Sequence, residues 1–285
     1  MKILDALLHT MRPYRWWRAA IVFIPFVFEG GAFNIFSILK MSVSFIVFCL
    51  VTGAINIIDD VVDKKTDRND PLKATLPIAS GELSESKAEF SVAAILLGSF
   101  VAAFFFGPVF GAIVIAYFLI ETAYYLYLKN EPFIDAVCIA VEMSLILLGG
   151  SIVSQRMISP WFFVFVLAVS VFIVLAEKKR AMLLALAVKP AGESPKENGL
   201  LEQGLTISAA CAILIYCFYA LSSLEGIKYG MILTTPLVFY AVFRVLMLTY
   251  DNGSEKALEK KLLGDGRFLV TVILWVVAAA VLSVI

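Results

Sequence analysis

The chain has 285 residues, of which 61% are hydrophobic, with a mean hydropathy of +0.92 and a net charge of zero. Only 16% of the residues are charged, against about 25% in soluble domains. A water-soluble fold of this length has too little interior to hide so much apolar surface. The composition therefore predicts an integral membrane protein, and it excludes disordered, coiled-coil and nucleic-acid-binding proteins.

Nine mostly apolar stretches are long enough to cross a membrane as a helix, which takes about 20 residues. In chain order they are residues 17–36, 41–58, 88–107, 109–128, 133–153, 160–177, 206–224, 229–249 and 267–285. We expect an all-α integral membrane protein with nine transmembrane helices, folded as a single domain over residues 1–285.

Lys and Arg are distributed unequally between the two sides of this arrangement. The segments on the side of the N-terminus hold 19 of them, and the opposite side holds three, Lys40, Arg156 and Lys228. The positive-inside rule then places the N-terminus and the long polar loops in the cytoplasm of a multi-pass protein of the cell membrane. Polar loops gathered on one face favour an enzyme with a cytosolic substrate over a channel.

Acidic residues are concentrated at the end of the second expected span. Five aspartates fall within twelve residues: Asp59, Asp60, Asp63, Asp67 and Asp70. If the span continues as a helix, Asn56, Asp59 or Asp60, Asp63 and Asp67 share one face, where like charges repel. Oxygen ligands without His or Cys suit Mg²⁺, which proteins hold through a few carboxylates plus substrate phosphates. The alternative is a solvated loop that its own Lys and Arg residues neutralise.

Three further groups of charged residues each have two interpretations. Lys178, Lys179 and Arg180 follow the sixth span, where they hold a phosphate or anchor the helix at the cytoplasmic surface. Arg12, Arg15 and Arg18 alternate with aromatic residues, which indicates an interfacial belt or contact with a lipid phosphate. Glu142 and Arg244 lie within expected spans, where charge is costly, and are functional candidates or structural partners.

The segment from Asp59 to Arg68 resembles the first aspartate-rich motif of the UbiA superfamily of intramembrane prenyltransferases, and the following Pro77–Gly81 is also typical of that superfamily. Within the superfamily, the pattern Asp67-Arg68-Asn-Asp-Pro71-Leu-Lys73 is similar to the branch of decaprenyl-phosphate phosphoribosyltransferases. Weaker matches to the branch follow in the right order along most of the chain. Four positions depart from the pattern: Asp59, Leu76, Ile146 and Leu183.

The resemblance implies a bundle whose active-site cavity opens to the cytoplasm, and it implies that Asp60, Asp63 and Asp67 are catalytic and hold Mg²⁺ on a diphosphate. The implied substrate-binding residues are Arg15, Asp59, Arg68, Lys73, Lys129, Lys178, Lys179 and Arg180. The expected reaction moves 5-phosphoribose from phosphoribosyl diphosphate (PRPP) to a polyprenyl phosphate, so the expected partners are a polyprenyl lipid, a diphosphate donor and membrane lipids. Assembly as a homo-oligomer is left open.

Two other functions are compatible with the sequence. The first is a prenyltransferase of the same superfamily that moves an isoprenoid from a prenyl diphosphate to an aromatic or glycerol-based acceptor. The second is a non-catalytic protein that binds or transports lipid. The donor distinguishes the two transferases, and turnover distinguishes both of them from the lipid-binding protein.

Overall fold

The computed structural model describes residues 2–28, 35–69, 73–128, 133–188, 197–222, 229–251 and 257–284, and the regular structure in these ranges is helical. The chain divides into two compact units whose segments alternate along the sequence. Unit 1 comprises Met1–Pro25, Ala32–Ile134 and Leu145–Arg156, and unit 2 comprises Phe26–Gly31, Asp135–Ser144 and Met157–Ile285.

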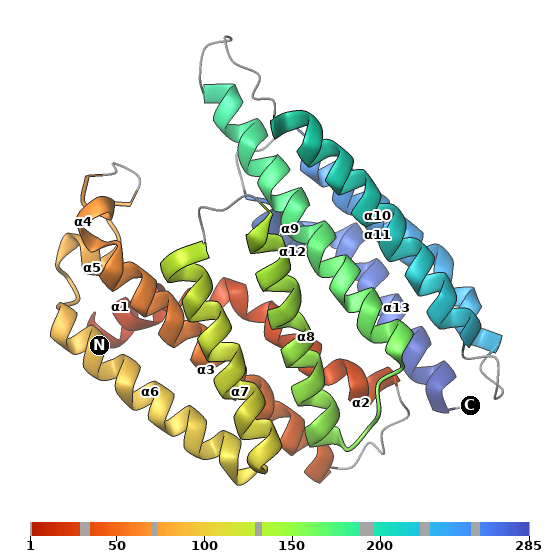
Figure 1. Ribbon diagram of the computed structural model, residues 1–285, viewed down its shortest axis with the longest axis horizontal. Helices are drawn as coiled ribbons and strands as arrows, with labels where there is room; N and C mark the ends of the chain where they lie inside the picture. Colours follow the sequence, from red (N-terminus) through yellow and green to blue (C-terminus); the bar gives the residue numbers. More distant parts are fainter. Residues whose placement is uncertain are drawn as a thin grey trace. The chain divides into compact units, whose positions relative to one another are not determined.

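Unit 1 is built around the long helix α3. Its elements are α1 (Lys2–Thr10), the 3₁₀-helix η1 (Pro13–Phe23), α3 (Ile35–Val62), α4 (Lys64–Asp67), α5 (Pro77–Ser80), α6 (Glu85–Phe105), α7 (Pro108–Ala123), the π-helix η2 (Tyr124–Leu128) and the second half of α8 (Ile134–Ser154). Helices α6 and α7 form an antiparallel pair, and α3 packs against both of them and against η1 (Figure 1). Side chains of α3 such as Phe48 and Ile55 are almost fully buried in this packing.

Unit 2 is a second group of long helices. It contains most of α2 (Ile24–Phe28), the first half of α8, α9 (Pro160–Val188), α10 (Glu197–Ser222), the 3₁₀-helix η4 (Tyr229–Thr234), α11 (Thr235–Tyr250), α12 (Leu258–Gly264) and α13 (Gly266–Val284). Helices α9 and α10 lie side by side along their lengths (Figure 1). Aromatic contacts join these two helices and α13: the Phe162 and Tyr219 rings are 4.8 Å apart, and the indole N–H of Trp275 on α13 donates to the Tyr216 hydroxyl on α10 at 2.8 Å.

Seven helices in the described ranges are long and apolar enough to cross a membrane, and the bent pair α12–α13, with a 72° angle, brings the number to eight if it is one span. Each expected span from 41–58 onward coincides with one of these helices or with the bent pair. The first expected span, 17–36, differs. Its described part is the end of η1 followed by α2, and Pro25 within it has no N–H for a helical hydrogen bond.

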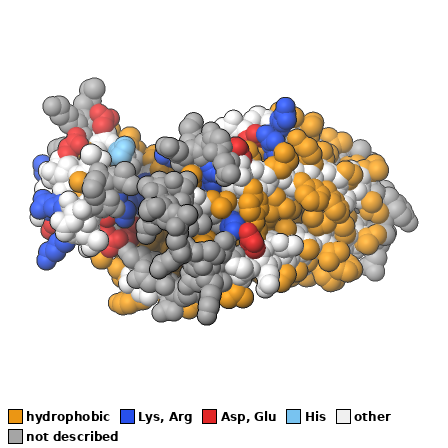
Figure 2. Space-filling model, turned by 90° about the horizontal axis from the view of Figure 1, so that it is seen from above, with side chains coloured by type: hydrophobic (Ala, Val, Ile, Leu, Met, Phe, Trp, Pro, Cys, Tyr) orange, Lys and Arg blue, Asp and Glu red, His pale blue; other side chains and the backbone are white. Residues whose placement is uncertain are grey.

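The surface carries the apolar side chains expected of a protein in contact with lipid. Phe90, Phe105 and Leu233 are 76%, 90% and 78% exposed, which a water-soluble protein rarely allows over a wide area. Figure 2 shows a broad apolar area that only a few Lys, Arg, Asp and Glu side chains interrupt. The protein is a multi-pass membrane protein.

Candidate functional site

The aspartate-rich segment begins in the last turn of α3 and continues into α4. The junction at Asp63 interrupts the regular helix, yet its N–H donates to the Asp59 carbonyl and the Asp67 N–H donates to the Asp63 carbonyl, both at 2.9 Å. These two bonds keep a four-residue repeat across the junction, although α3 ends at Val62 and α4 begins at Lys64. In a continuous helix residues four apart share one face; Asp59, Asp63 and Asp67, together with the adjacent Asp60, are called the aspartate stripe below.

Two cations contact the ends of this aspartate stripe. At its start, Arg12 forms an ion pair and hydrogen bond with Asp60 and lies 3.7 Å from Asp59. At its end, the Lys73 ammonium lies 3.1 Å from an Asp67 carboxylate oxygen. The Asp60 and Asp67 side chains are only 2% and 5% exposed, so each cation neutralises a carboxylate that is largely shielded from water.

The segment after the aspartates folds back through α5. Pro77 occupies its first turn, where a missing N–H costs nothing, and Gly81 ends it with a φ of 86°, a left-handed conformation that glycine adopts readily. The Arg68 Nε donates to the Ala79 carbonyl at 2.8 Å. This bond ties the end of α4 to α5.

Arg15, on η1, contacts both α3 and η2. Its Nη1 lies 3.0 Å from the Tyr125 hydroxyl on η2 and 3.4 Å from the Asn56 amide oxygen on α3. Tyr125 could not be predicted from the sequence, because a π-turn rotates the residues at the end of α7 away from their α-helical directions without a clear sequence signal. The predicted Lys129 lies outside the described residues.

The donor chemistry of this segment fits a magnesium ion that is shared with a substrate. Within the described ranges, no group of three or more His, Cys, Asp or Glu side chains is arranged to hold a metal ion. A closed protein cage is not what Mg²⁺ requires, because it keeps waters and binds through one or two carboxylates plus phosphate oxygens. The Asp60 Oδ2 is buried and has no hydrogen-bond partner among the described residues. A nearby cation or water would satisfy this buried oxygen.

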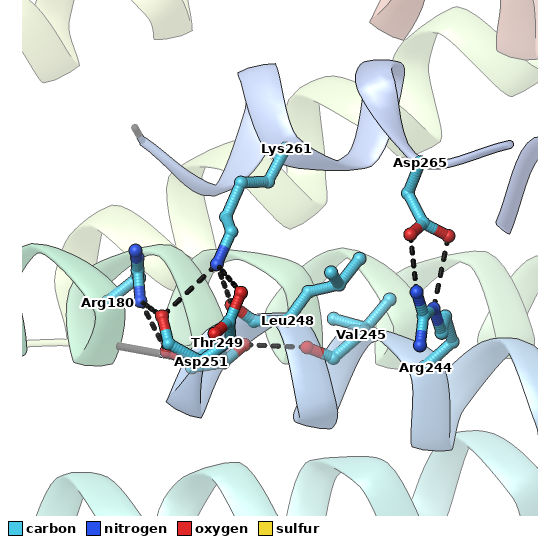
Figure 3. A network of polar contacts seen from close by, with 8 residues as sticks. All are labelled: Arg180, Arg244, Val245, Leu248, Thr249, Asp251, Lys261 and Asp265. Atoms are coloured by element: carbon cyan, nitrogen blue, oxygen red, sulfur yellow. Dashed lines mark hydrogen bonds and ion pairs between the residues drawn. The ribbon is translucent and has the colours of Figure 1, made fainter. Parts of the chain in front are cut away.

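The basic residues after the sixth expected span lie within unit 2, inside the last turns of α9 and not in a loop. Lys178 forms an ion pair with Asp135 at 2.5 Å, and Lys179 forms one with Glu202 at 2.6 Å. Arg180 donates to the carbonyls of Thr249 and Asp251 at the end of α11 (Figure 3). Lys179 and Arg180 are each 1% exposed, so both have structural contacts, and a phosphate-binding role for the three residues stays a prediction.

Two other contacts in Figure 3 fix the neighbouring turns. The Lys261 ammonium donates to the Asp251 carboxylate at 2.7 Å and to the Leu248 carbonyl at 3.3 Å. Cations at this position complement the unpaired carbonyls at the C-terminal end of a helix, here α11. The Arg244 guanidinium makes a two-point contact with Asp265 at 3.1 and 2.5 Å. This contact agrees with one of the two interpretations of Arg244, that it has a structural partner.

The family model of the UbiA prenyltransferase family matches residues 19–272. The chain belongs to the UbiA prenyltransferase family. It is accordingly a membrane transferase with the all-helical fold of that family.

Individual members of the UbiA family show how far the likeness extends. The chain is 25% identical over 292 residues to the decaprenyl-phosphate phosphoribosyltransferase of Mycolicibacterium smegmatis, covering 96% of this chain and 91% of the relative. It is 27% identical over 248 residues to the digeranylgeranylglyceryl phosphate synthase of Methanospirillum hungatei, covering 79% of this chain and 82% of the relative. A solved UbiA homologue from Archaeoglobus fulgidus, bound to DMAPP and Mg²⁺, matches with a TM-score of 0.73 and 15% identity, covering 97% of this chain and 98% of that chain. At that identity the solved structure supports the fold alone.

Proposed function

We propose that the protein transfers 5-phosphoribose from PRPP to a polyprenyl phosphate, with release of diphosphate. The observation that carries this proposal is the aspartate stripe at the end of an apolar helix, with Lys73 paired to Asp67 and Arg68 bonded to α5 beside it. A stripe of oxygen ligands flanked by cations is suited to a metal-bound diphosphate. The likeness to a phosphoribosyltransferase over 96% of the chain supports phosphoribose as the transferred group.

In this proposal Asp60, Asp63 and Asp67 hold Mg²⁺, and Asp59 belongs to the same stripe. When bound, the ion would offset negative charge on the departing diphosphate. The cations Arg68 and Lys73 bind phosphate oxygens, for which Lys73 exchanges its contact with Asp67. Arg15, fixed against Asn56 and Tyr125, binds a phosphate of the donor or the lipid.

The proposed reaction requires little proton transfer from the protein. A lipid phosphate is already ionised near neutral pH, so its oxygen attacks the anomeric carbon as the bond to the diphosphate breaks, and no general base is needed. The lone histidine, His9, is therefore not required for the chemistry. The work of the protein is to position the two phosphates and to offset their charge.

The membrane arrangement that accompanies this proposal has nine crossings with the aspartate stripe on the cytoplasmic side. The excess of Lys and Arg on the side of the N-terminus supports that orientation. PRPP is a water-soluble donor and the polyprenyl phosphate is a membrane lipid, so a site at the end of a spanning helix, open to the cytoplasm, gives access to both.

The second candidate is a prenyltransferase with a glycerol-based or aromatic acceptor, which the likeness to the Methanospirillum hungatei enzyme favours. A donor screen separates the two. Purified protein is incubated with Mg²⁺, total polyprenyl phosphates and either radiolabelled PRPP or radiolabelled prenyl diphosphates, with chelator controls.

Label from PRPP in the lipid fraction is the expected result. Transfer from prenyl diphosphates alone would support the second candidate. If neither donor is used under any Mg²⁺ condition, the remaining function is non-catalytic lipid binding or transport.

A further inference from the structure

Arg12 has an unusual backbone conformation at the junction of α1 and η1. Its φ of 51° and ψ of 63° lie in the left-handed region, which residues with a Cβ rarely adopt. Hydrogen bonds hold this turn on both sides, from the Arg12 N–H to the His9 carbonyl at 3.3 Å and from the Arg15 N–H to the Arg12 carbonyl at 3.0 Å. Unfavourable conformations of this kind persist where the surroundings fix them.

The turn is also fixed to the helix that bears the aspartates. The Asn56 side-chain amide donates to the carbonyl of Met11, the residue before Arg12, at 3.2 Å. From there the guanidinium reaches Asp60 and Asp59, and the Arg12 side chain is only 17% exposed. The same helix thus binds the backbone next to Arg12 and, one turn later, its charged group.

Electrostatics explains why a cation at this point matters. Asp59 and Asp60 are adjacent carboxylates in a largely buried setting, and one guanidinium contacts both. The second oxygen of Asp60 remains buried with no hydrogen-bond partner among the described residues. We propose that Arg12 is the internal counter-cation of the aspartate stripe. It neutralises Asp59 and Asp60 in the metal-free protein and competes there with the divalent cation.

This inference rests on the proposed function, because it assumes that the stripe binds Mg²⁺. It goes further in assigning a positioning residue, on a different element, that sets the affinity for the metal. Arg12→Gln removes the competing charge and keeps a polar side chain. A water-like dielectric sets the lower limit for a +1 and a +2 charge several ångströms apart, and these side chains are largely buried, so the expected gain in Mg²⁺ affinity is about tenfold or more.

The test titrates the detergent-purified full chain with Mg²⁺ alone, without donor or lipid, and follows the melting temperature and the heat of binding. Arg12→Gln should melt lower than the wild type without metal, and its half-saturating Mg²⁺ concentration should fall about tenfold or more. The matched control is Lys64→Gln, which removes a cation beside Asp63 that is instead paired with Glu85 at 2.5 Å. The control should titrate like the wild type.

A second measurement uses the wild type alone, so it does not depend on whether the variant folds. Hydrogen exchange of residues 10–18 should become faster when Mg²⁺ is added, because the metal releases Arg12 from the aspartates. Unchanged exchange in a protein that binds Mg²⁺ would overturn the inference, as would an Arg12→Gln variant with the wild-type Mg²⁺ midpoint. A wild type that binds no Mg²⁺ at all would instead overturn the proposed metal site, and the competition with it.

Discussion

Replacement of Gly150 by alanine is a sharp test of how η1 is held in unit 1. A Cβ at Gly150 on α8 would lie 2.1 Å from the carbonyl oxygen of Val22 on η1 and 2.9 Å from its carbonyl carbon. These are backbone atoms, so no side chain can rotate away, and η1 itself must shift. Glycine at a helix crossing permits this close approach.

The magnitude follows from two opposing terms. Alanine is favoured over glycine in a helix interior by about 1 kcal/mol. Overpacking that displaces backbone costs about 1–3 kcal/mol or more, and a contact of 2.1 Å belongs at the upper end of that range. The net result for Gly150→Ala is a loss of about 2 kcal/mol, or roughly 5 °C in melting temperature for a chain of this size.

The matched control is Gly98→Ala in α6, where a Cβ meets no atom within 4 Å. Both variants are measured by thermal unfolding of the detergent-purified protein, monitored by tryptophan fluorescence. Gly98→Ala should be neutral or slightly stabilising, and Gly150→Ala should be clearly destabilised. Equal melting temperatures for the two variants would refute the close approach of η1 to α8, and with it the placement of Arg12 and Arg15.

Three other predictions concern the charged contacts. Arg180→Met should destabilise the protein by about 3 kcal/mol, because the Thr249 carbonyl loses its cationic donor and the Asp251 carbonyl keeps only the Lys261 ammonium. An unchanged melting temperature in thermal unfolding would contradict the Arg180 contacts. Arg244→Gln and Asp265→Asn should each lower the melting temperature. The melting temperature of the double variant should be no lower than that of the less stable single variant, because the same Arg244–Asp265 contact is broken in all three proteins. Additive decreases in melting temperature would rule out the pairing. Lys73→Gln should raise the KM for the diphosphate donor several-fold, because a neutral amide holds a phosphate oxygen less strongly than the ammonium does; an unchanged KM would exclude it from phosphate binding.

The order and spacing of the helices could be predicted from the sequence because apolar length is a local property. The spacing of the aspartates is a local property in the same way, and the bonds from Asp63 to Asp59 and from Asp67 to Asp63 keep the four-residue repeat, but α3 ends at Val62 and Asp63 lies between two helices. The stretch 17–36 could not be predicted in this way, since apolar length alone does not distinguish a straight span from a 3₁₀-helix followed by a short α-helix.

The partners of the charged residues were beyond the reach of local patterns. Arg12 meets Asp60 across 48 residues, and Arg15 meets Tyr125 across 110. Arg180 was predicted to hold a phosphate or to anchor its helix, and its contact with the end of α11 depends on how far α9 extends. Such contacts depend on how helices pack, which single-sequence patterns of charge and hydropathy do not specify.

The central claim is that the aspartate stripe holds a metal-bound diphosphate. Its most direct test is the Mg²⁺-dependent release of labelled diphosphate from the accepted donor by the wild type, Asp63→Asn and Asp67→Asn. The matched control is Asp5→Asn on α1, an exposed aspartate in the same unit. We predict that both stripe variants lose at least 100-fold of the wild-type rate, an estimate of about 3 kcal/mol in transition-state stabilisation, and that Asp5→Asn retains it. Wild-type release by folded Asp63→Asn and Asp67→Asn variants would contradict the claim.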